Sequence, residues 1–297
     1  MIEFLQQLIN GLSVGFVYAL LALGYTMVYG ILRFINFAHS DVFMVGAFCG
    51  FYMGKHVPAH SLWGGLLVIV LTMLVCALLG IIIERLAYRP LRGGSSLAVL
   101  ITAIGVSLLL ENAGQLVFGA DPKYFPELFP AKVYVSSSGL RVSSNQLLVF
   151  VVTAVLLFAL QWIVLRTRTG TAMRALSFNA QAASLVGINN DRVISFTFGL
   201  GSALAAAGGI LYSMNYPSID PYMGVLPGLK AFVAAVLGGI GNIPGAALGG
   251  ILLGLIETFV KGTRFSTYTD AIAFGLLIVI LLFRPAGLLG KFQVEKV

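Results

Sequence analysis

Charged side chains are scarce in this chain, and their scarcity excludes most classes of soluble protein. Asp, Glu, Lys and Arg together make up 10% of the 297 residues, whereas ordinary globular domains carry about 25%. Hydrophobic residues make up 59%, and the mean hydropathy is +0.97. On such a chain the net charge of +7 indicates loops beside anionic membrane lipid and no nucleic-acid partner. The composition predicts an integral membrane protein.

Several motifs of enzymes are also missing. The two cysteines, Cys49 and Cys76, lie in apolar stretches and offer neither a disulfide framework nor a CxxC motif. The three histidines are too scattered to predict a metal site. No GxxxxGK(S/T) loop is present, so we expect this chain not to hydrolyse ATP by itself. Because no Ser-His-Asp or paired-carboxylate cluster is present either, the sequence does not predict an enzyme.

Apolar stretches of membrane-spanning length fill most of the chain. A helix needs about 20 apolar residues to cross the hydrocarbon core. We expect spans at residues 8–32, 62–83, 97–119, 145–165, 193–215 and 269–283, with a further apolar stretch that ends at Gly54. The spacings Gly11/Gly15 and Gly46/Gly50/Gly54 predict close helix contacts, although glycine is also simply frequent in membrane helices.

Residues 228–258 form another apolar stretch, which glycine and proline at 238–245 break into two halves. We expect each half to be short for a full crossing. A helix broken at membrane depth is tolerated where it lines a cavity or packs in protein. The stretch therefore supplies candidate pathway residues: Lys230, Gly238, Gly239, Gly241 and Asn242. The alternative is a helical hairpin with a cytoplasmic glycine turn; in either case Lys230 could pair with Glu257.

Polar residues also precede the apolar stretch that ends at Gly54. Asn36, His39 and Asp41 lie at its head, and an acid within the bilayer usually faces a cavity or a partner. These three are candidate pathway residues. Alternatively, they lie at the membrane interface and cap the helix that follows.

The segment 166–192 is a basic, polar interruption between two apolar blocks. Asn179 is suited to cap a short helix over 180–186, and Gly187 is suited to end it. A helix of roughly 10 Å is marginal alone in water, so we expect it to dock against a partner. Small or apolar side chains would suit a partner's groove: Ala182, Ala183 and Leu185. The alternative is a solvated loop whose arginines set the topology.

Basic residues gather on one side of the predicted spans, as in cytoplasmic loops. Ten of the 18 fall on that side: Arg85, Arg89, Arg92, Arg166, Arg168, Arg174, Arg192, Arg284, Lys291 and Lys296. This predicts a cytoplasmic segment 166–192, a cytoplasmic C-terminus and an external N-terminus, with about nine crossings, or eight if the glycine-broken stretch is re-entrant.

The loop 120–144 is then external. Its segments 132–135 and 140–142 predict a small hairpin, which contacts a soluble binding protein or caps the helices.

The pattern Gln181-Ala182-Ala183, three residues, then Gly187 resembles the EAA-x-x-x-G loop of ABC-importer permeases, which contacts their ATPase. Gln stands here for the usual Glu, and Ala180 for the usual Pro. Further motifs resemble the permease subunits of branched-chain amino acid ABC importers: residues 15–25, Asn36-Phe37-Ala38-His39, Arg174 with Asn179, Gly187-Ile188-Asn189, 228–232, 237–242 and Arg284-Pro285-Ala286-Gly287. Together, and in this order, they are similar to the shorter member of that family's two-permease pair.

The resemblance implies a single membrane domain over residues 1–297. It would be an all-α polytopic protein of about 8–9 membrane or half-membrane helices, similar to the permeases of vitamin B12 and ribose importers. The segment 166–192 would be the loop that couples it to an ATPase. The coupling residues would be Arg174, Asn179, Gln181, Ala182, Ala183, Leu185 and Gly187.

The same resemblance implies the partners. These are a second homologous permease in a heterodimer, two ABC ATPase subunits that hold the ATP, and a periplasmic protein that delivers leucine, isoleucine or valine. No cofactor is implied for this chain, which would lie in the bacterial inner membrane. Two alternatives stay open: a related permease for urea or short amides, and an ATP-independent channel or secondary transporter that uses the glycine-broken helix.

Overall fold

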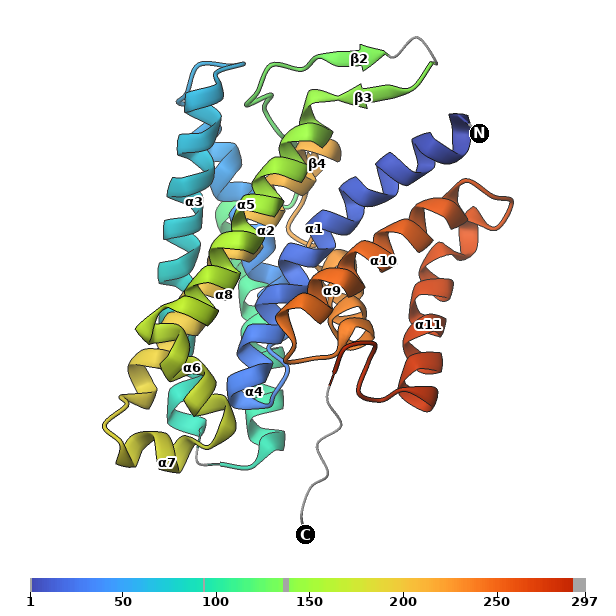
Figure 1. Ribbon diagram of the computed structural model, residues 1–297. Helices are drawn as coiled ribbons and strands as arrows, with labels where there is room; N and C mark the ends of the chain where they lie inside the picture. The colour runs from blue at the N-terminus through green and yellow to red at the C-terminus, as the bar shows by residue number, and fades with distance from the viewer. Residues whose placement is uncertain (1, 93, 136–138, 291–297) are drawn as a thin grey trace.

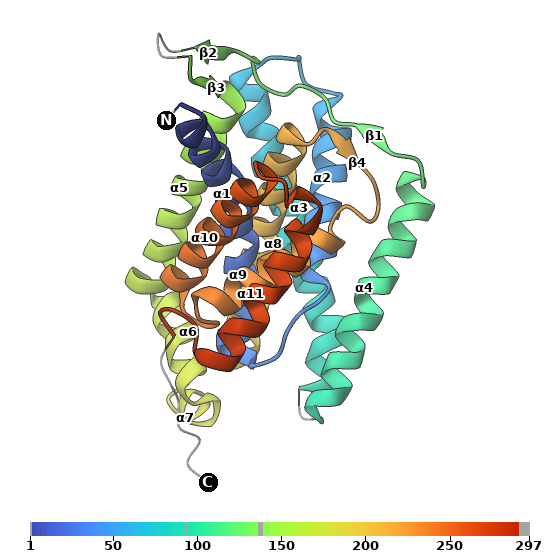
Figure 2. The same ribbon diagram turned by 90° about the vertical axis from the view of Figure 1, so that its right-hand side faces the viewer.

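The computed structural model shows a bundle of helices, with two small two-stranded sheets in the described part of the chain (Figures 1 and 2). The structure describes residues 2–92, 94–135 and 139–290. The helices are α1 (Ile2–Leu32), α2 (His39–Gly54), α3 (Leu62–Ile83), α4 (Ser96–Phe118), α5 (Ser144–Arg166), α6 (Arg168–Phe178), α7 (Ala180–Leu185), α8 (Asn190–Asn215), α9 (Val225–Gly238), α10 (Ile243–Lys261) and α11 (Thr269–Phe283). The expected all-α architecture is confirmed.

Seven helical stretches among the described residues are long and apolar enough to cross a membrane. They are α1, α4, α5, α8 and α10, the run Leu62–Leu91 that begins with α3, and the run Ser266–Phe283 that contains α11. α9 is a shorter apolar helix of 14 residues. The protein is therefore a multi-pass membrane protein, as its composition predicts.

The two ends of the bundle carry different structures (Figure 1). We call the end that carries the strands and the N-terminus the outer end. There β2 (Val133–Val135) pairs antiparallel with β3 (Arg141–Ser143), close to the start of α1. The predicted hairpin is thus present, and its tip at 136–138 lies outside the described residues. β1 (Lys123–Tyr124) pairs with β4 (Ser218–Ile219) at the same end.

We call the opposite end, where α6 and α7 lie, the inner end (Figure 1). The distribution of basic residues predicts that this end is cytoplasmic. Lys291 and Lys296, which contribute to that prediction, lie outside the described residues.

The fold contains two groups of four helices, and the first helix of each group packs against helices of the other group. No motif in the sequence predicts this arrangement. The first group is α1 to α4, and the second is α8 to α11. α1 packs against α9 and α10 of the second group, whereas α8 packs against α2 and α3 of the first. α1 runs from the outer towards the inner end and α8 runs back (Figure 1). Repeats of opposite direction are common in transporters.

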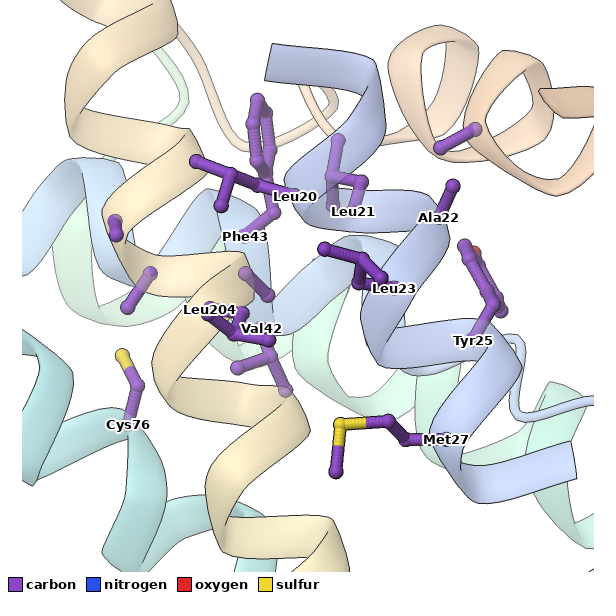
Figure 3. Packing of buried hydrophobic residues seen from close by; sticks show 14 of the residues in the cluster. Leu20, Leu21, Ala22, Leu23, Tyr25, Met27, Val42, Phe43, Cys76 and Leu204 are labelled. Atoms are coloured by element: carbon purple, nitrogen blue, oxygen red, sulfur yellow. The ribbon is translucent and has the colours of Figure 1, made fainter. Parts of the chain in front are cut away.

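The core lies where α1 and α8 cross the centre of the bundle. Leu20 and Leu23 of α1 lie near Phe43 of α2 and Leu204 of α8, and all four side chains are fully or almost fully buried (Figure 3). The outer helices α3, α4, α5 and α11 instead expose apolar side chains along much of their length. This distribution fits a bundle whose outer surface contacts lipid or another membrane subunit.

Glycine lets the central helices approach closely. A Cβ atom at Gly15 of α1 would lie 2.8 Å from the Cα of Ile251 in α10, and one at Gly46 of α2 would lie 2.5 Å from the Cα of Ala206 in α8. A larger residue would force the helices apart. The close helix contacts predicted from the glycine spacings are therefore confirmed for Gly11, Gly15, Gly46 and Gly50, whereas Gly54 meets Leu128 and Pro126 of the outer loop.

Candidate functional site

The short helix α7 has both ends closed by the residues that the sequence predicted. Asn179 accepts a hydrogen bond through its side-chain oxygen from the N–H of Ala182, at 2.9 Å. At the other end Gly187 has a φ of +86°. The N–H of Ile188 then donates to the carbonyl of Ala183 at 3.0 Å, which is the longer bond of a Schellman motif. These bonds satisfy backbone groups that a six-residue helix would otherwise leave to water.

Three apolar side chains at the inner end project from the protein with 77–90% of their area exposed: Phe178, Leu185 and Val186. We call them the coupling patch. Gln181 and Ala182 are exposed beside it. Ala183, however, is only 3% exposed, so it packs inside this chain and does not present its side chain to a partner. Phe178 is absent from the predicted coupling residues because it precedes the capping residue and belongs to α6.

Side chains from neighbouring helices hold this segment in place. The guanidinium of Arg174 donates to the carbonyl of Val164 in the last turn of α5, and to Thr171 Oγ1 at 3.3 Å. Asn190, the first residue of α8, donates from its side chain to the carbonyl of Ala180 at 2.9 Å. Arg174 therefore holds α6 against α5, and Asn190 ties α7 to α8. A displacement of α7 is expected to move the start of α8 with it.

A cluster of four charges, which we call the inner cluster, joins the end of α3 to the start of α8: Glu84, Arg89, Arg92 and Asp191. Asp191 forms ion pairs with both arginines, at 2.8 Å with Arg92. Arg92 also pairs with Glu84, which is fully buried and accepts a hydrogen bond from Ser195 of α8. Burial lowers the pKa of the Arg92 guanidinium, and nearby Asp191 opposes that shift. The sequence indicated only a basic segment here, because Asp191 lies about 100 residues further along the chain.

Two of the predicted pathway residues, Asn36 and Asp41, are buried and hydrogen-bonded inside this chain. Oδ1 of Asn36 accepts a bond from the Tyr88 hydroxyl at 2.6 Å, and Oδ2 of Asp41 accepts one from Ser107 of α4 at 2.5 Å. α2 begins at His39 without a side-chain cap, so the alternative that these residues cap that helix is wrong. Their contribution to a pathway stays a prediction that requires movement between helices.

His39, the third residue of that group, fills a notch between α1 and α8. Its ring lies edge-on to Tyr25 of α1, with ring centroids 4.8 Å apart. It also packs against Gly24, where a side chain would occupy the same space. Its Nε2 atom has no hydrogen-bond partner among the described residues. The ring is therefore positioned by packing, close to the centre of the core.

The glycine-rich turn between α9 and α10 packs against the segment after α11. The N–H of Leu289 donates to the carbonyl of Gly238 at 3.0 Å, and the side chain of Asn242 donates to the carbonyl of Leu289 at 2.6 Å. Gly239 and Gly241 have φ values of +106° and +90°, which favour glycine. α10 has 19 residues and can cross a membrane, so the expectation of two short halves is wrong for the second half. The first half, α9, has 14 residues and is short for a full crossing, as expected.

Lys230, the remaining pathway candidate, belongs to a buried ion network of α9, α10 and α11. Its Nζ atom lies 2.9 Å from Glu257 and 2.7 Å from Asp270. Glu257 also pairs with Lys261 at 2.7 Å and accepts a bond from the Tyr18 hydroxyl of α1 at 2.8 Å. The pairing of Lys230 with Glu257 that the sequence left open is therefore present. The charge of Lys230 is compensated within the chain.

A cavity of about 290 Å³ opens towards the outer end among α1, α5, α8 and α10. Its lining mixes polar and apolar side chains, including Asn10, Ser13, Val17, Gln146 and Lys261. The cavity could not be predicted from the sequence, because its lining residues come from separate helices and form no motif.

The chain is similar to one family of known proteins along almost its whole length. Residues 7–281 match the family described as "Branched-chain amino acid transport system / permease component". The chain is 47% identical to the high-affinity branched-chain amino acid transport system permease protein BraD of Pseudomonas aeruginosa, over 99% of this chain and 98% of that protein. It is 42% identical to the corresponding permease protein LivH of Escherichia coli strain K12, again over 99% and 98%.

One solved structure is also similar in outline. PsaBC from Streptococcus pneumoniae in complex with Fab superposes with a TM-score of 0.48 at 14% identity, over 96% of this chain and 93% of that chain.

Proposed function

This chain belongs to the permease family of branched-chain amino acid transport systems, and we propose that it is one of two permease subunits of an ATP-driven importer for leucine, isoleucine and valine. In that role it forms half of the translocation pathway across the bacterial inner membrane. The relatives BraD and LivH are named as permeases of branched-chain amino acid transport systems, and each matches nearly the whole of this chain. Their names therefore support the proposed class of substrate.

The observation that carries the proposal is the coupling patch at the inner end. A permease without an ATP-binding loop needs a contact through which movement of an ATPase reaches its helices. α7 is suited to this because Asn179 and Gly187 close its ends while Phe178, Leu185 and Val186 stay exposed. Burying each of these side chains in a partner's groove would contribute about 1.5–3 kcal/mol.

The proposed assembly contains a second homologous permease, two ATPase subunits and a periplasmic binding protein. ATP is held by the ATPase subunits, and we expect this chain to bind no cofactor. The exposed apolar faces of α3, α4, α5 and α11 support contact with lipid and with the second permease. Closure of the ATPase dimer would push on α7 and change access to the pathway. This requires that the ATPases bind the two permease states with different affinity.

Uptake into proteoliposomes that contain all subunits separates the candidate substrates. We expect ATP-dependent uptake of labelled leucine, and no comparable uptake of urea or acetamide. Preferential uptake of urea or acetamide would replace the proposed substrate class. Uptake of leucine without ATP would favour the channel or secondary-transporter alternative.

The Leu185→Ser variant tests the coupling patch. Removing this apolar contact should lower both ATPase co-purification and uptake by about tenfold or more. Phe265→Ser is the control, because Phe265 is an apolar side chain that is 51% exposed in the loop after α10, at the end of the bundle opposite α7 (Figure 1). Normal assembly and uptake in Leu185→Ser would exclude this docking surface. Ala183→Asp would be a poor test, since Ala183 is buried and the acid would disturb α7 itself.

A further inference from the structure

The inner end contains a continuous line of contacts from α7 to the loop between α1 and α2. Asn190 ties α7 to α8, and the next residue, Asp191, forms ion pairs with Arg89 and Arg92. Immediately before Arg89, the fully buried Tyr88 donates its hydroxyl hydrogen to Asn36, at 2.6 Å. Each step is a hydrogen bond, an ion pair or a covalent bond. The line therefore connects the coupling patch to a residue beside the start of α2.

Tyr88 is held on two sides by aromatic rings. Its ring centroid lies 5.2 Å from that of Phe34, in the loop before α2, and 5.4 Å from that of Phe198 in α8. These contacts do not depend on the hydroxyl group. The bond to Asn36 is directional, because a hydroxyl donates to one amide oxygen. A displacement of Tyr88 would thus pull Asn36 along that bond.

The segment that carries Tyr88 is not a regular α-helix. Glu84–Tyr88 forms a π-helical turn at the end of α3, in which the N–H of Arg89 donates to the carbonyl of Glu84, five residues earlier. Such turns are rare and are often found at functional sites. Glu84 pairs with Arg92 across this turn. A movement of Asp191 would therefore act on the turn and Tyr88 before it acts on the body of α3.

We propose that Tyr88 and Asn36 form the joint through which movement of α7 reaches the loop between α1 and α2. This inference rests on the proposed function and adds a pair of positioning residues to it. Neither side chain contacts the coupling patch directly. Their bond instead links the inner cluster, at the start of α8, to the segment that precedes His39 and Asp41.

The test measures ATP hydrolysis and leucine uptake in the same proteoliposomes with the complete transporter. Tyr88→Phe keeps the ring and its aromatic contacts and deletes only the hydroxyl. Loss of one buried hydrogen bond between uncharged groups changes an equilibrium by about fivefold to tenfold. We therefore expect uptake per ATP hydrolysed to fall by about fivefold to tenfold, with hydrolysis near the wild-type rate. Tyr268→Phe, at a side chain that is 60% exposed, is the matched control.

A double-mutant cycle with Asn36→Ala then tests whether the two residues act through one bond. We expect the double variant to lose no more uptake per ATP than either single variant. Additive losses would overturn the proposal, and so would a proportional fall of hydrolysis and uptake in Tyr88→Phe. Failure of the proposed function would appear separately, as missing leucine uptake in the wild type. Failure of this inference would appear as an unchanged ratio in Tyr88→Phe.

Discussion

Replacing Glu257 by glutamine tests the buried ion network at its centre. Glu257 accepts contacts from Lys230 at 2.9 Å, Lys261 at 2.7 Å and the Tyr18 hydroxyl at 2.8 Å. The network holds two positive and two negative charges, because Asp270 also contacts Lys230. Glutamine keeps the size of the side chain and removes one negative charge. The variant would leave a net positive charge around a lysine whose side chain is 8% exposed.

The expected loss can be worked from these distances. A charge pair 2.9 Å apart interacts by about 6 kcal/mol at an effective dielectric constant of about 20, and desolvation cancels part of this. Removing one partner of a buried pair costs about 3–5 kcal/mol. We expect the lower value, about 3 kcal/mol, because Asp270 still lies 2.7 Å from Lys230. Lys261→Gln should cost less than about 1 kcal/mol, since that side chain is 49% exposed.

Thermal unfolding of the purified subunit in detergent measures both losses. For a chain of this size 3 kcal/mol corresponds to a fall in Tm of about 5–10 °C, and 1 kcal/mol to at most about 3 °C. All scans need one heating rate, because membrane proteins of this size unfold irreversibly. The double variant Lys230→Met with Glu257→Gln should regain more than half of the loss, because it removes both buried charges. A Tm for Glu257→Gln no lower than that for Lys261→Gln would refute the reasoning.

Two further substitutions test local features of the fold. Gly187→Ala should destabilise the end of α7 by about 1–2 kcal/mol, because a φ of +86° is unfavourable for a residue with a Cβ atom. Hydrogen exchange of the Ile188 amide should then accelerate by about tenfold, and unchanged exchange would contradict the Schellman motif. Gly15→Ala should lower the Tm because it overpacks α1 against α10 by about 1–3 kcal/mol. Gly105→Ala, which meets open space on α4, should not; equal Tm values for the two would contradict the close contact.

Helix ends, the hairpin and the long helices could be predicted from the sequence, because each depends on residues that are close together in the chain. Asn179 and Gly187 close α7 as expected, because a cap and a left-handed stop depend only on residues within one helical turn. The hairpin of β2 and β3 and the positions of the long helices follow from alternation and apolar length, which are equally local. The break at 238–245 was also predicted, although the length of α10 was underestimated.

Contacts between distant residues could not be predicted in the same way. Glu84 and its hydrogen-bond partner Ser195 are 111 residues apart, and Tyr18 and Glu257 are 239 residues apart. At the end of an apolar stretch Glu84 indicates a membrane boundary, and only the packing of α3 on α8 shows that it is buried. The burial of Ala183 could not be predicted from the sequence either. Ala182 and Ala183 look alike in sequence, and only the fold shows that Ala183 faces inward.

The two buried glutamates join the two helix groups to each other. Glu84 follows α3 and accepts a bond from Ser195 of α8, whereas Glu257 lies near the end of α10 and accepts a bond from Tyr18 of α1. α3 and α10 are the third helices of their groups, and α8 and α1 are the first. Because the groups run in opposite directions, one junction lies at the inner end and the other towards the outer end (Figure 1).

The position of these junctions relative to α7 predicts different roles for them. The inner junction contains Asp191, which follows α7 by six residues, so a push on α7 acts on it directly. The outer junction lies at the other end of the bundle from α7 (Figure 1), and we expect it to keep its contacts during that push. We therefore expect a hinge about the outer junction. It follows that Glu257→Gln should lower thermal stability without changing uptake per ATP hydrolysed. Tyr88→Phe should lower uptake per ATP hydrolysed and cost less thermal stability than Glu257→Gln, because it deletes one hydrogen bond between uncharged groups.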